Sequence, residues 1–156
     1  MRKLIVGMFV SAAILTSATA HAVDEPGLTS GQMVVLELIM RSIVNMYSSN
    51  VIITDSYGNG GIVKEDALAA MAQNREFLKI LTGYAMEMKR QNTAEDRKTV
   101  EFLAKLTEVC SDVGLQLNAM EDYIEKNDKA SIALLNKCRS KLEMSIEELL
   151  NSDLSD

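Results

Sequence analysis

The sequence predicts an all-α protein, an up-down-up-down antiparallel four-helix bundle that follows an N-terminal signal peptide. Three observations indicate this fold class. The chain is rich in Leu, Ala, Met, Glu and Lys, which are good helix formers. Its only proline, Pro26, precedes the expected folded region. Apolar residues recur at spacings of three and four, and alternating strand patterns are scarce.

Residues 1–22 have the pattern of an export signal. Arg2 and Lys3 supply the positive start, and residues 4–15 form an apolar core that is too short to span a bilayer. Ala20-His21-Ala22 then gives the small–x–small pattern of a cleavage site. We therefore expect cleavage after Ala22 and a single helical domain over residues 23–156, located in the periplasm or secreted.

Cleavage would leave an acidic domain. Of the 16 basic residues, Arg2 and Lys3 would be lost, so 14 would remain against 22 acidic residues, a net charge of −8. Binding to nucleic acid needs clustered Lys and Arg that neutralise phosphates, and attraction to anionic lipid needs the same charge. We therefore expect no nucleic-acid partner, and no membrane association once the signal has been removed.

The only histidine, His21, would also be lost on cleavage. A chain without histidine has no Ser-His-Asp or Cys-His catalytic arrangement and no His-ligated zinc, copper or haem iron. We therefore expect a protein that is not an enzyme and that holds no cofactor, apart from the weak calcium site considered below.

The first helix, about residues 30–50, has Thr29 or Ser30 as its N-cap candidate. It is unusual because ten of the fourteen residues from Met33 to Met46 are apolar, whereas a bundle helix needs an apolar face over only about a third of its circumference. A generous core or a covering segment would explain this. The alternative is an apolar groove or self-association surface on this helix, with a possible interaction face formed by Met33, Leu36, Met40, Ile43 and Met46.

Three further helices are expected at about residues 63–90, 94–126 and 129–150. The third has the most regular apolar seam, and the short joins on either side of it favour antiparallel neighbours. Asn127 suits a helix end, and Asp128 suits the start of the next helix. The seam of the third helix consists of Leu103, Leu106, Cys110, Val113, Leu117, Met120 and Ile124.

The stretch from Asp55 to Asp66 resembles an EF-hand calcium loop. In the twelve-residue register, Asp55 falls at position 1, Asn59 at 5, Gly61 at 7 and Asp66 at 12, with a glycine at position 6. Position 3 holds a tyrosine, and position 9 has no side-chain oxygen. The sequence therefore predicts at most weak calcium binding, and the alternative is a glycine-rich turn between two helices.

The two cysteines of an exported chain suggest a disulfide. Cys110 lies 17 residues before Asn127, and Cys138 lies 11 residues after it. In a symmetric hairpin this difference displaces the two by about 9 Å along the helix axis, and a bridge needs Cα atoms within about 7 Å. A bridge and two free, buried thiols therefore both remain open.

The function that these observations favour is a non-enzymatic exported protein that binds a protein partner through a helix face, as an adaptor, inhibitor or immunity-type protein. Self-association is a further possibility. The alternative is a carrier of a small ligand or of weakly bound calcium.

Overall fold

A computed structural model describes residues 28–91 and 97–152 of the chain. Over these ranges the protein has four α-helices and no strand: α1 (Ser30–Gly58), α2 (Lys64–Gln91), α3 (Arg97–Lys126) and α4 (Lys129–Leu150). The prediction of an all-α fold with four helices is confirmed. The expected signal peptide and its cleavage site lie outside the described residues, as does the expected start of the third helix at residue 94.

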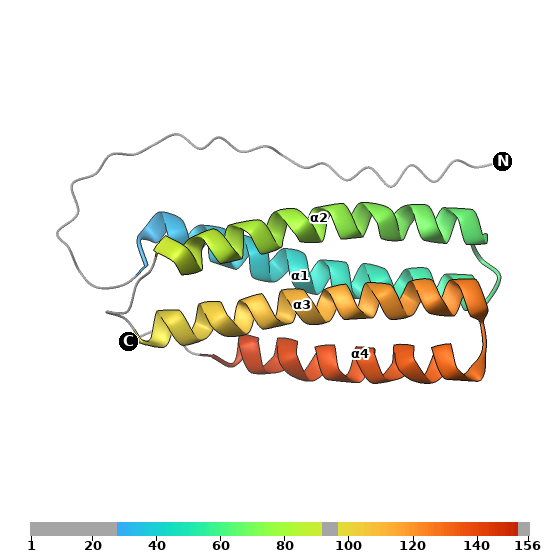
Figure 1. The fold of residues 1–156 in the computed structure, drawn as a ribbon. Helices are drawn as coiled ribbons and strands as arrows, with labels where there is room; N and C mark the ends of the chain where they lie inside the picture. The colour runs from blue at the N-terminus through green and yellow to red at the C-terminus, as the bar shows by residue number, and fades with distance from the viewer. Residues whose placement is uncertain (1–27, 92–96, 153–156) are drawn as a thin grey trace.

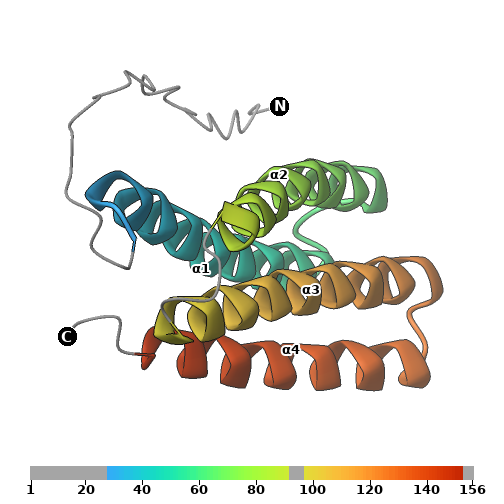
Figure 2. The same cartoon turned by 60° about the vertical axis from the view of Figure 1, so that its left-hand side comes forward.

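The four helices lie side by side along one long axis (Figure 1). α2 and α4 lie on opposite sides of α3 in both views (Figures 1 and 2). α3 packs against each of the other three helices, whereas α1 packs mainly against α2 and α3. The core is therefore organised around α3.

The sequence of α3 explains this central position. All seven residues of its predicted seam are buried, which confirms that seam. Buried residues also flank the seam, and they include Phe102, Val109 and Ala119. A single seam would serve one neighbouring helix, and the flanking apolar residues let α3 bury surface against three neighbours.

Local signals define the helix ends. Thr29 caps α1, because its side chain accepts a hydrogen bond from the backbone of Gln32 while the Gln32 side chain accepts one from the backbone of Thr29. Asp128 caps α4 through the same reciprocal arrangement with Ser131. Asn127 adopts a left-handed φ of 46° between α3 and α4, which asparagine tolerates better than most residues.

α1 is longer than its sequence pattern indicates. We expected an end near residue 50, but the helix continues to Gly58. Tertiary contacts account for the extension: Thr54 is buried, and the Tyr57 hydroxyl donates a hydrogen bond to the carbonyl oxygen of Ile124 at 3.0 Å. The Tyr57 ring also packs edge-on against Tyr123 with 5.8 Å between ring centroids. Packing against α3 thus outweighs the weak helix propensity of the β-branched residues in this segment.

Candidate functional site

The strongest candidate for a binding surface is a groove between α3 and α4. It measures about 320 Å³ and has mostly apolar walls. Leu115 on α3 and Leu134 on α4 stand at its edges with 50% and 43% of their surface exposed. We call this the α3–α4 groove, and it is lined by Leu115, Asn118, Ala119, Asp122, Leu134, Lys137, Cys138 and Lys141.

Helical spacing produces the groove. Leu115 and Asn118 are three residues apart on α3, and Leu134, Lys137, Cys138 and Lys141 follow the same three-and-four spacing on α4. The small side chain of Ala119 and the short side chain of Cys138 face this space. The larger leucines stand beside them, so a depression remains along the line where the two helices meet.

Charges around the groove are partly neutralised by neighbours. The Lys141 ammonium group donates to the Asp112 carboxylate at 2.6 Å, and this hydrogen bond raises the pKa of Lys141. Ser145 donates to the other oxygen of the same carboxylate at 3.0 Å. Asp122 accepts from Lys126 at 2.6 Å. Lys137 has no ion-pair partner among the described residues, so the rim of the groove is basic although the whole chain is acidic.

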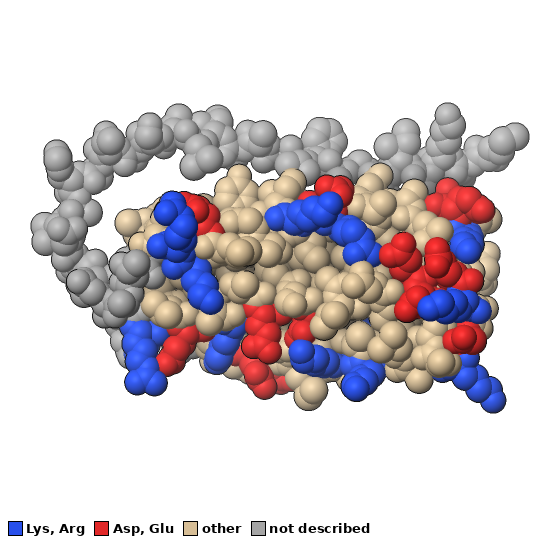
Figure 3. All heavy atoms as spheres, viewed as in Figure 1, with Lys and Arg blue, Asp and Glu red and all other residues tan. Residues whose placement is uncertain are grey.

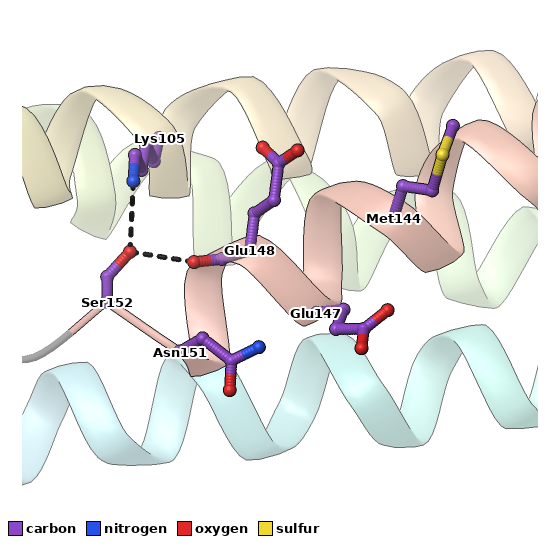
Figure 4. Close-up of a pocket in the computed structure, with 6 residues that line it drawn as sticks. All are labelled: Lys105, Met144, Glu147, Glu148, Asn151 and Ser152. Carbon is purple, nitrogen blue, oxygen red and sulfur yellow. Dashed lines mark hydrogen bonds between the residues drawn. The ribbon is translucent and has the colours of Figure 1, made fainter.

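A second, larger depression of about 430 Å³ lies where α4 ends (Figure 4). Lys105 reaches it from α3 and donates to the hydroxyl of Ser152 at 3.2 Å. The carboxylates of Glu147 and Glu148 point in different directions in Figure 4, so the polar groups do not converge on one point. Its lining is mixed polar and apolar, and it lacks the converging polar groups of a typical ligand site (Figure 4).

A set of polar side chains crosses the interior of the molecule, and we call it the polar layer. The Asn74 side-chain amide donates to the Asn50 side-chain oxygen at 2.8 Å, and the Asn50 amide donates to the Gln116 side-chain oxygen at 3.0 Å. Asn50 and Gln116 are fully buried. One turn further along α1, the Arg139 guanidinium donates to the Thr54 hydroxyl and, at 3.1 Å, to the Asp55 carboxylate. The layer thus joins all four helices through Asn50, Thr54, Asn74, Gln116 and Arg139.

The residues of the EF-hand-like stretch occupy different local structures. Asp55 lies in the last turn of α1, where its carboxylate pairs with Arg139. Asn59 is the C-cap of α1, Gly61 follows it in the connection, and Asp66 lies in the exposed first turn of α2. Helical geometry therefore extends over residues 55–58, the first third of the stretch. Calcium binding here stays a prediction, and a bound ion would compete with Arg139 for Asp55.

The two cysteines are free thiols in this structure. Cys110 is buried and faces Thr82 of α2, and burial raises its pKa. Cys138 lies in the α3–α4 groove beside Leu115 and Ala119. This register is close to the one expected for a symmetric hairpin, which places Cys138 near Leu117.

The structure places the residues of the possible interaction face on the first helix at different depths. Leu36, Ile43 and Met46 are buried in the core, Met40 is half-buried, and only Met33 is exposed. Leu36, Ile43 and Met46 belong to the core and Met40 packs against it, whereas Val34 and Leu38 of the same apolar segment are exposed. The sequence did not predict the α3–α4 groove. The available signal was Leu115, an apolar residue outside the predicted seam of the third helix.

Other kinds of site find little support in the described part of the chain. Within it, no group of three or more His, Cys, Asp or Glu residues lies close enough to hold a metal ion. No helix over those ranges combines the length and apolar character needed to cross a membrane. On the face shown in Figure 3, basic and acidic side chains are interspersed, so neither sign forms a continuous field there.

Comparison of the chain with protein-family models, with curated proteins and with solved structures finds no match.

Proposed function

We propose that this chain is an exported, non-enzymatic bundle of up-down-up-down antiparallel topology that binds a protein partner through a helix face. The roles that suit such a protein are those of an adaptor, an inhibitor or an immunity-type protein. Support for export comes from the signal-like residues 1–22. Support for a non-enzymatic role comes from the loss of His21 that cleavage would bring.

One observation carries the binding proposal, the α3–α4 groove. Its half-exposed Leu115 and Leu134 stand beside Ala119 and Cys138, which provides an apolar depression for side chains of a partner. The unpaired Lys137 adds positive charge to its rim. A partner helix with apolar residues at spacings of three and four and acidic residues beside them would complement this surface.

The test is affinity capture from periplasmic extract with the exported protein as bait. The variant Leu115→Glu places a carboxylate at the edge of the groove on an exposed position, so the fold is preserved while the apolar contact is lost. The control is Met86→Glu, which makes a similar change at an exposed position of α2, away from the groove. We expect the wild type and Met86→Glu to retain the same partner and Leu115→Glu to retain at least about tenfold less of it, a loss of about 1.4 kcal/mol.

Equal capture by all three proteins would refute the groove as the binding surface. Native mass spectrometry of the purified protein distinguishes the other functions. A small molecule that copurifies would indicate a carrier, and a dimer mass without a partner would indicate self-association.

A further inference from the structure

The register of α1 is poorly specified by most of its buried apolar residues. Met46 is followed by Asn50 one turn later, but the other three, Leu36, Ile39 and Ile43, also occupy core positions on this helix. The residues four positions further on are Met40, Ile43 and Tyr47, which are also apolar or aromatic. If α1 slid by one helical turn toward its N-terminus, these residues would fill the same three positions. Unwinding of its last turn would lengthen the connection to α2 enough to allow the slide.

The polar layer discriminates between these registers. Asn50 both accepts from Asn74 and donates to Gln116, so it is the central member of a chain of three side-chain amides. A slide of one turn would bring Thr54 to the level of Asn50. The Thr54 hydroxyl donates its one hydrogen to backbone carbonyl oxygens of its own helix, at Asn50 and Val51, so it could accept from Asn74 but could not also donate to Gln116. Gln116 would then lose its donor in the interior, where an unpaired amide is costly.

We propose that the polar layer fixes the register of α1 against α2 and α3, and that Arg139 extends this selection to α4. The layer selects one arrangement and adds little to stability. Its hydrogen bonding is incomplete, because Gln116 Nε2 and Arg139 Nε are buried without a partner among the described residues. Interiors that carry such unpaired groups are often as stable or more stable when the polar residues are replaced by apolar ones of similar shape.

The test replaces the three amides of the layer together, with Asn50→Leu, Asn74→Leu and Gln116→Met, in the chain purified after export. We expect the midpoint of urea unfolding to stay equal to that of the wild type or to rise. We also expect a second set of NMR amide resonances for residues of α1, with about a tenth or more of the total intensity. The wild type should show one set.

A single variant covers the case in which the triple variant does not fold. Gln116→Met changes one side chain to an apolar residue of similar shape, and Leu117→Met at the adjacent buried position of α3 is its control. We expect a second set of α1 resonances for Gln116→Met and none for Leu117→Met. One sharp set in Gln116→Met, with the same α1–α3 nuclear Overhauser contacts as the wild type, would overturn the proposal.

Discussion

Tyr47 is one of the few residues through which α1 reaches α4. Its hydroxyl donates to the Glu143 carboxylate. Burial raises the pKa of Tyr47 to about 12, and the hydrogen bond and the negative charge of Glu143 act in the same direction. Because the folded protein holds this proton more tightly than the unfolded chain, Tyr47 contributes stability that is fully present below pH 10 and lost as the pH rises through 12.

The variant Tyr47→Phe should therefore weaken the alkaline loss of stability. Between pH 8 and pH 11 we expect the free energy of unfolding to fall by up to about 1 kcal/mol less than in the wild type, with allowance for solvent screening. Urea unfolding at the two pH values measures this difference. Tyr84→Phe, at a half-exposed position of α2, is the control. Equal pH dependence in all three proteins would contradict the role of Tyr47.

The two cysteines differ in burial, and this difference predicts their reactivity. Cys110 is 2% exposed, and burial raises its pKa, so both access and thiolate formation are hindered. Cys138 is only partly buried. A small thiol reagent should modify Cys138 about 100-fold or more faster than Cys110, which reacts only after the core opens. Mass spectrometry of timed samples measures both rates.

Cys138→Ser is the control for this labelling, and it should remove the fast reaction alone. Failure of both cysteines to react until a reductant is added would show that they are bridged. That result would contradict the assignment of both cysteines as free thiols and would support the Cys110–Cys138 disulfide that the sequence left open.

At the scale of the helices, two glycines should respond to substitution in opposite ways. Gly83 lies inside α2, and a Cβ atom there would meet no atom within 4 Å. Gly83→Ala should therefore raise the free energy of unfolding by about 0.5–1 kcal/mol, because alanine loses less backbone entropy on folding.

Gly60 has a φ of 72° in the connection between α1 and α2. Gly60→Ala should lower the free energy of unfolding by about 1 kcal/mol, because this conformation is strained for alanine.

Thermal or urea unfolding of the two variants beside the wild type measures these changes. A stability gain from Gly60→Ala would mean that the connection adopts another conformation in solution. A lower free energy of unfolding for Gly83→Ala would mean that the added methyl group clashes with a neighbouring atom on the outer face of α2.

The seam of α3 was predictable because it depends only on the spacing of apolar residues within one stretch of sequence. Seven apolar residues at spacings of three and four define one face of a helix whatever surrounds it. The end of α1 at Gly58 was not predictable in this way, because Tyr57 reaches a carbonyl oxygen on α3 that is 67 residues away in sequence. The apolar excess of α1 did not show which of its apolar residues face the core. Leu36 and Ile43 are buried, whereas Val34 and Leu38 are exposed, and this division depends on the helices that pack against α1.

The candidate site was only partly predictable. The polar layer depends on Asn50 meeting Asn74 and Gln116, which are 24 and 66 residues away in sequence. Asparagine and glutamine are usually found at exposed positions, so the sequence alone gives no sign that these three are buried. Their hydrogen bonds form only when the helices pack together. The α3–α4 groove likewise needs Ala119 and Cys138 to meet across the two helices.

At the scale of the whole molecule, α3 holds the bundle together, and the described helices begin well after the expected signal. The reciprocal hydrogen bonds of Thr29 and Gln32 cap α1, whose first residue, Ser30, lies eight residues beyond the expected cleavage site at Ala22. The buried core residues begin at Leu36, and Leu28 packs against them. Folding of the bundle should therefore not depend on residues 1–22.

This independence leads to a prediction about the exported protein. When the full chain is produced in a bacterial host, we expect the periplasmic fraction to contain a protein whose intact mass corresponds to residues 23–156. Its far-ultraviolet circular dichroism should show a helical spectrum with cooperative thermal unfolding, because cleavage leaves Thr29 and the core intact. Replacement of Ala20 and Ala22 by Leu, which removes the small residues that the peptidase recognises, should abolish the processed mass. A periplasmic protein that keeps His21 would contradict cleavage after Ala22 and would reopen the histidine chemistry that cleavage excludes.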